Sequence, residues 1–168
     1  MSRQGRNLSK VMANTYTQIH IQAVFTVQNR ECIISDRWNG IIQNNHHKLI
    51  SINGMPDHIH ILFGLRPNQS LSDLLQDIKG SSSKWINERK FVKGKFSWQE
   101  GFGAFSYSKS EISKIADYID SQKMHHSRKT FSEEYIEMLN EFGVEYDCRY
   151  IFTPVDIDYI VPDGTLKG

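Results

Sequence analysis

Two histidines, His58 and His60, lie two positions apart in a short apolar segment of the chain. Pro56 and Asp57 precede them, and the residues up to position 63 are rich in β-branched and apolar types, which predicts a strand. Because side chains along a strand alternate between its two faces, both imidazoles should project from one face, with apolar residues on the other. Such a pair can form half of a divalent-metal site.

The histidine pair alone leaves several interpretations open. A single strand histidine is usually a partly buried residue whose ring is satisfied by a hydrogen bond. Two on one face are harder to explain in this way, because that face then holds little but polar nitrogen. The His-x-His pattern fits zinc hydrolases, carbonic-anhydrase-like sites, cupins and nucleic-acid enzymes. A metal site would also need at least one more ligand and a reaction to serve.

Tyr118 and Gln122 are candidates for these missing parts. They lie on a predicted helix over 110–124 that begins at a capping box, and one turn separates them on one flank of its apolar stripe. Taken singly, each reads as an ordinary helix residue. Taken with the histidines, the amide oxygen of Gln122 could join the imidazoles on a hard divalent ion, and the hydroxyl of Tyr118 could attack a phosphodiester.

Three basic residues are candidates for contacts with a nucleic-acid backbone: Arg30, Lys79 and Lys84. Lys79 and Lys84 flank a run of small polar residues at 80–83. This run is either a poor stretch in the middle of a helix or a place where phosphates approach backbone and hydroxyl groups. Taken alone, the run favours the first interpretation.

Length and composition set the limits of these interpretations. The 168 residues suffice for one domain with a core, and the 20 Lys and Arg nearly balance the 19 Asp and Glu. Two distant cysteines predict neither a disulfide framework nor a cysteine zinc site. No apolar run reaches the length of a membrane span, and residues 1–11 lack the apolar region of a signal peptide, so we expect a cytoplasmic protein.

The order of predicted elements indicates the fold. Strands are expected at 16–28, 48–53, 57–63 and 103–107, and helices at 36–45, 70–90, 110–124 and 130–142. This order predicts an α+β fold, a ferredoxin-like or RRM-like sandwich with an antiparallel sheet and a C-terminal tyrosine-bearing helix. Helices should cover one face, leaving the histidine face open unless a later helix covers it. We expect a disordered extension at 1–12, one domain at 13–152 and a tail at 153–168.

Four blocks of sequence carry a family resemblance in the order in which they occur: 55–60, 79–85, 98–106 and 118–126. Together they resemble the small single-tyrosine HUH transposases of bacterial insertion sequences, whose relatives include the REP-associated tyrosine transposases. The resemblance extends from about position 16 to position 152. The four ordered blocks make it specific, although His-x-His alone is a weak signal.

The resemblance implies a DNA transposase that acts on single strands folded into hairpins. It implies that His58 and His60 bind Mg²⁺ or Mn²⁺ and that Gln122 completes the metal site. Tyr118 would attack a DNA phosphate, become joined to the 5′ phosphate and release a 3′ hydroxyl. Family members are homodimers, so the resemblance also implies a homodimer.

Other classes of protein remain as alternatives. One is a replication- or conjugation-type HUH nicking enzyme, although such relatives often join a helicase and no P-loop pattern occurs here. Another is a catalytically decayed module that only binds nucleic acid, which would leave the histidine pair unexplained. A zinc hydrolase is a third, but no further ligand follows at a familiar zinc spacing.

Overall fold

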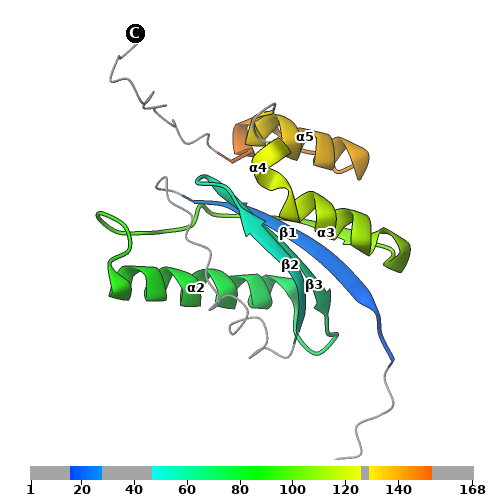
Figure 1. The fold of residues 1–168 in the computed structure, drawn as a ribbon, viewed down its shortest axis with the longest axis horizontal. Coiled ribbons are helices and arrows are strands. Elements are labelled where there is room, and N and C mark those ends of the chain that lie inside the picture. Colours follow the sequence, from blue (N-terminus) through cyan, green and yellow to red (C-terminus); the bar gives the residue numbers. More distant parts are fainter. Residues whose placement is uncertain (1–15, 28–46, 126–128, 153–168) are drawn as a thin grey trace, which may run out of the picture.

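The sheet has four antiparallel strands in the order β2-β3-β1-β4, as the computed structural model shows (Figure 1). The structure describes residues 16–27, 47–125 and 129–152. The strands are β1 Ile19–Thr26, β2 Lys48–Gly54, β3 His58–Leu65 and β4 Gly103–Tyr107. This arrangement confirms the predicted α+β, ferredoxin-like fold class. The predicted helix at 36–45, the extension at 1–12 and the tail at 153–168 lie outside the described residues.

Helices pack on both faces of the sheet. They are α2 Leu71–Arg89, α3 Ile112–Asp120, α4 Gln122–His125 and α5 Phe131–Glu141, with short 3₁₀ turns at Lys109–Glu111 and Cys148–Tyr150. In Figure 1, α2 lies on one side of the sheet and α3 and α5 lie on the other. The histidine face, which the sequence left open unless a later helix covered it, is therefore covered. Among the described residues, no helix is long and apolar enough to cross a bilayer.

The two central strands present opposite chemistry to the two helical layers. Toward α2 they present an apolar face, whose buried members on these strands are Ile21, Ala23, Phe25, Ile59, Ile61 and Phe63, with Val27 directly after β1. The other face carries Gln22, Thr26, His58 and His60, all of them buried. The strand predicted at 16–28 is therefore present, and the later helices bury its polar side at Gln22 and Thr26.

Helix α2 runs without interruption through the small polar run at 80–83. Its N-cap is Ser70, whose Oγ accepts a hydrogen bond from the backbone N–H of Asp73 at 3.1 Å. Ser82 Oγ donates to the carbonyl of Ile78 at 2.6 Å and accepts from Nε1 of Trp98 at 3.0 Å. The run is thus an ordinary part of a helix, and its buried serine ties the helix to the loop that precedes β4.

The predicted helix over 110–124 is broken at Ser121. The capping box at Ser108 is present, but α3 ends at Asp120 and α4 starts at Gln122. Asn53, on β2, donates to the carbonyls of Ile119 at 2.9 Å and Asp120 at 3.1 Å. Since these are carbonyls that a continuing helix would use internally, a contact from a distant strand ends the helix here.

Glycine at position 103 is required by the packing of α5 on the sheet. A Cβ at Gly103 would lie 2.6 Å from Cε2 and 2.8 Å from Oη of Tyr135, whereas a Cβ at Gly80, within α2, would meet nothing within 4 Å. We predict that Gly103→Ala lowers the free energy of unfolding by about 1–3 kcal/mol, because the ring of Tyr135 must move.

The control for Gly103→Ala is Gly80→Ala, which should raise the free energy of unfolding by about 0.5–1 kcal/mol by restricting the unfolded chain. Urea denaturation of the two variants and the wild type measures both effects. Equal stability of Gly103→Ala and the wild type would show that Tyr135 does not press on β4.

Candidate metal centre and nucleophile

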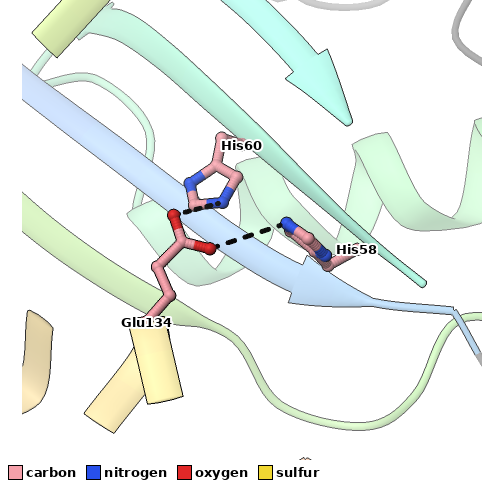
Figure 2. Close-up of side chains that lie close together, drawn as sticks. All are labelled: His58, His60 and Glu134. Carbon is pink, nitrogen blue, oxygen red and sulfur yellow. Dashed lines mark ion pairs between the residues drawn. The ribbon is translucent and has the colours of Figure 1, made fainter. Parts of the chain in front are cut away.

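His58 and His60 lie side by side on β3, and both are fully buried. Their ring centroids are 5.1 Å apart. Nδ1 of His58 lies 2.7 Å from Oδ1 of Asp57, and Nδ1 of His60 lies 2.9 Å from the side-chain amide of Gln22. Because these contacts occupy the Nδ1 side of each ring, both Nε2 atoms are left to face the third member of the cluster (Figure 2).

The contact with Asp57 fixes the chemical form of His58. A carboxylate accepts a hydrogen bond from the Nδ1–H of His58, which leaves the lone pair of the ring on Nε2. A carboxylate behind a histidine is the usual support for a metal-binding imidazole, since it orients the ring and makes it more basic. A neutral His58 in this contact would therefore present its lone pair on Nε2, toward the cluster.

Gln22 has the corresponding position behind His60. This buried glutamine lies on β1, and its amide nitrogen Nε2 donates a hydrogen bond to Nδ1 of His60 at 2.9 Å. Ligation through Nε2 needs a proton on Nδ1, so the amide oxygen of Gln22 is the end that supports a metal-binding His60. The structure presents the nitrogen end, which favours the tautomer protonated on Nε2, so metal binding by His60 would require the amide group of Gln22 to turn over. The orientation of Gln22 thus sets the tautomer of His60.

Glu134, on α5, completes a cluster of three candidate ligands. Its Oε1 lies 3.6 Å from Nε2 of His60, and its Oε2 lies 3.9 Å from Nε2 of His58 (Figure 2). The candidate ligand atoms of the three residues all lie within 4.8 Å of one another. Burial raises the pKa of the Glu134 carboxyl to about 8, and the negative charges of Asp57 and Glu137 add to this effect.

The distances within this cluster fit a shared cation. Separations of 3.6 and 3.9 Å exceed the length of a hydrogen bond. Two ligands that are each about 2.1 Å from one ion are about 3.0 Å apart at a right angle and about 4.2 Å apart on opposite sides of it. The residues present therefore suit a divalent metal.

Gln122, the predicted third ligand, reaches the same cluster. It is fully buried at the start of α4, and its Nε2 lies 3.1 Å from Oε1 of Glu134, to which it donates a hydrogen bond. The structure therefore brings Gln122 together with His58 and His60, with Glu134 as a direct partner of its amide nitrogen.

Tyr118, the predicted nucleophile, lies at the edge of the cluster. Its ring centroid is 6.1 Å from that of His60, with the two rings nearly perpendicular, and the side chain is partly exposed. Helix α3 is held against β2 by the two hydrogen bonds from Asn53 and by one from Ser51 Oγ to Asp120 Oδ1 at 2.7 Å. Tyr118 and His60 therefore meet within a single chain.

The predicted DNA contacts lie elsewhere. Lys79 and Lys84 are on α2, on the side of the sheet opposite to α3 and α5 (Figure 1). Nζ of Lys79 donates to the carbonyls of Gln99, at 3.0 Å, and Gly101. Burial lowers the pKa of Lys79 to about 8. Lys84 is exposed and forms an ion pair with Glu88 at 3.9 Å. Arg30 lies outside the described residues.

Sequence reasoning missed Glu134, although the sequence contains a signal for it. The apolar side assigned to the helix at 130–142 includes Phe131, Tyr135 and Met138. Glu134 lies three residues after Phe131 and four before Met138, which places a carboxylate on the buried side of an amphipathic helix. Buried carboxylates are rare unless they are paired. Its neighbour Glu133 belongs to the capping box with Thr130 and is exposed at the helix start.

Comparison with known proteins gives the family of this chain. The family model described as "Transposase IS200 like" matches residues 15–122. This chain belongs to the IS200-like transposase family. The match spans the strands, α3 and Gln122, so it includes both histidines and Tyr118 and ends before α5 and Glu134. The family model therefore supports a transposase but does not cover the helix that supplies the third member of the cluster.

One curated relative and two solved structures are similar to this chain. The ISDra2 transposase TnpA of Deinococcus radiodurans is 28% identical over 94 residues, which are 53% of this chain and 67% of the relative. A solved protein of the same organism, described as a candidate transposase, has a TM-score of 0.50 at 20% identity. The aligned part covers 67% of this chain and 97% of the solved chain. A REP-associated tyrosine transposase bound to a REP hairpin has a TM-score of 0.49 at 15% identity, and the aligned part covers 68% of this chain and 73% of the solved chain.

The hydrogen bonds that hold α3 against β2 can be tested by mutation in this IS200-like transposase. Asn53→Ala removes the donor to two carbonyls of α3 and the acceptor for the backbone N–H of Gly54. We predict that this change lowers the free energy of unfolding by roughly 1–3 kcal/mol, because partly buried groups lose their partners. Asn68→Ala, at an exposed asparagine, should change it by less than about 0.5 kcal/mol. Urea denaturation measures both, and equal effects would mean that Asn53 does not hold α3.

Proposed function

We propose that this chain is a metal-dependent transposase that cleaves and rejoins single-stranded, hairpin-bearing DNA through Tyr118. The observation that carries the proposal is the position of the Tyr118 ring, 6.1 Å from the ring of a buried histidine in a cluster suited to a divalent cation. Family membership supports a transposase. Single-stranded hairpins as the substrate rest on the resemblance of the four sequence blocks.

The proposed reaction exchanges one phosphate ester for another. The hydroxyl oxygen of Tyr118 attacks a DNA phosphorus, the new O–P bond joins the tyrosine to the 5′ phosphate, and the P–O3′ bond breaks. The phenol loses its proton to solvent, which reaches this partly exposed residue, and the departing 3′ oxygen takes up a proton. A 3′ hydroxyl later attacks the phosphotyrosine and releases Tyr118. Since the number of phosphate esters is conserved, no ATP is required.

His58 and His60 would hold the cation, which we propose to be Mg²⁺ or Mn²⁺, and Gln122 stays the predicted third ligand. When bound, the ion neutralises charge on the phosphate and orients the leaving oxygen. Asp57 and Gln22 contribute by holding the two imidazoles from behind. Because both histidines are fully buried, the phosphate would have to approach the site from the side of Tyr118, which is partly exposed.

The partners of the chain stay predictions. We propose contacts between a DNA backbone and Arg30, Lys79 and Lys84, although the ammonium of Lys79 already donates to two backbone carbonyls. We also propose a homodimer in the cytoplasm. The position of α3 does not require a partner chain, since Tyr118 and His60 meet within one chain.

Covalent capture tests the nucleophile. Hairpin oligonucleotides from the DNA that flanks the coding region, labelled at the 3′ end, are incubated with protein and Mn²⁺. We predict a labelled adduct that survives denaturing electrophoresis, because the fragment on the 5′ phosphate stays attached to Tyr118. Tyr118→Phe keeps the ring but removes the nucleophile, so its adduct should disappear.

The control for this experiment is Tyr150→Phe, at an exposed tyrosine outside the cluster, which should form adduct at the wild-type level. An undiminished adduct with Tyr118→Phe would reject the assigned role. Adduct at the wild-type level in both variants would mean that another residue is the nucleophile.

Metal titration tests the histidines in the absence of DNA. We predict that the wild type binds about one equivalent of Mn²⁺ in calorimetry and that the double variant His58→Ala/His60→Ala binds none, because two of its ligands are gone. His20→Ala, on β1 and opposite Gly64 of β3, should bind like the wild type. Circular dichroism must show that each variant is folded, because the two rings are buried and His58 stacks on Phe131. Unchanged Mn²⁺ affinity in a folded double variant would eliminate the proposed site.

A further inference from the structure

We propose that Glu134 is a protein ligand of the metal and that Gln122 positions its carboxylate. The inference rests on the proposed metal-dependent function and adds a residue that lies beyond the segment matched by the family model. It makes the centre a set of two imidazoles and one carboxylate, drawn from β3 and α5, in place of the Gln122 amide that the family resemblance implies as third ligand.

The geometry of the carboxylate supports ligation. Its two oxygens divide between the histidines, with Oε1 toward Nε2 of His60 at 3.6 Å and Oε2 toward Nε2 of His58 at 3.9 Å (Figure 2). Both separations fall in the range of about 3.0–4.2 Å expected for two ligands of one ion. Both are too long for direct hydrogen bonds. The three side chains thus surround a common point without bonding tightly to one another.

The first turn of α5 explains how a residue so far along the chain reaches the histidines. The hydroxyl of Thr130 accepts a hydrogen bond from the backbone N–H of Glu133 and thereby fixes the start of the helix. Phe131 stacks on the imidazole of His58, with ring centroids 4.1 Å apart and planes inclined by 18°. Glu134 lies three residues later, on the same side of the helix, so the stack that docks α5 also directs the carboxylate at the cluster.

The chemistry of the set favours a hard or borderline divalent ion. Mg²⁺ and Mn²⁺ prefer oxygen ligands, and a carboxylate is a stronger ligand for them than a neutral amide. Glu134 neutralises half of the charge of such an ion, and Asp57 behind His58 supplies a second negative charge close to the centre. A buried carboxylate is costly when it is alone and is compensated by a bound cation.

Gln122 acts on the metal through Glu134 in this proposal. Its amide nitrogen donates to Oε1 of Glu134 at 3.1 Å and thereby orients the carboxylate. Gln122 is thereby a positioning residue for the carboxylate, and its contribution to metal binding should depend on Glu134 being present.

The experiment is Mn²⁺ calorimetry on the full chain without DNA. Glu134→Gln keeps the shape of the side chain and removes its charge, and we expect at least a tenfold loss of affinity. The matched control is Glu137→Gln, an exposed glutamate one turn further along α5, whose affinity should stay within about threefold of the wild type. Thermal unfolding in EDTA should show Glu134→Gln to be at least as stable as the wild type, since it no longer buries an ionisable group.

A double-mutant cycle tests the role of Gln122. Gln122→Ala should weaken Mn²⁺ binding in the wild type by several fold and should have no further effect in Glu134→Gln, because the positioned group is absent there. A purely structural role for Gln122 predicts the same loss in both backgrounds, and equal losses would reject the positioning role.

The outcomes separate this inference from the proposed function. Wild-type affinity in Glu134→Gln, combined with loss in the double histidine variant, would overturn the role of Glu134 and leave the histidine site standing. Absence of Mn²⁺ binding in the wild type would overturn both. If Glu134→Gln does not fold, a crystal structure of the wild type with Mn²⁺ decides. A carboxylate oxygen within about 2.5 Å of the ion supports the inference, and a longer distance overturns it.

Discussion

The carboxylate of Glu134 between two buried imidazoles is the constraint on which the polar face of the sheet, covered by α3 and α5, depends. A carboxylate in such a place must be neutral or be compensated by positive charge, and burial accordingly raises its pKa to about 8. The groups around it are polar and come from separate elements: Gln22 from β1, the histidines from β3, and Gln122 from α4. A polar network of this kind fits only one arrangement of its elements, so it specifies how the helices dock as well as what they can bind.

The sheet keeps this network apart from the main core. One face of β1 and β3 packs in an apolar layer with α2, where no polar compensation is needed. A second, smaller cluster around Val24, Phe105 and Tyr135 attaches α5 to the other face. Stability and chemistry therefore reside largely on opposite sides of the same strands. The period of two in a strand makes this division available to a continuous run of residues such as 58–63.

Local signals in the sequence were sufficient to predict the described helices and strands. The features that they did not predict depend on contacts between residues far apart in the chain. The side chains at Ser70, Ser108 and Thr130 mark helix starts that the structure contains, because a capping side chain acts within three residues. The break at Ser121 depends on Asn53, 66 to 67 positions from the carbonyls it contacts. The burial of His58 and His60 depends on α5. The spacing of apolar residues along α5 shows that this helix has a buried side, but not which face of the sheet it covers.

The break in the tyrosine helix has a consequence for how nucleophile and ligand can work together. On an unbroken helix, Tyr118 and Gln122 would lie on one ridge at similar depth, one turn apart. With α3 ended by Asn53, the chain turns at Ser121, and Gln122 becomes fully buried against Glu134 while Tyr118 stays partly exposed beside His60. A group that helps to hold a metal benefits from exclusion of water, whereas a group that attacks DNA must be reached by it. One hydrogen-bonding asparagine on β2 therefore lets two residues four positions apart satisfy opposite requirements.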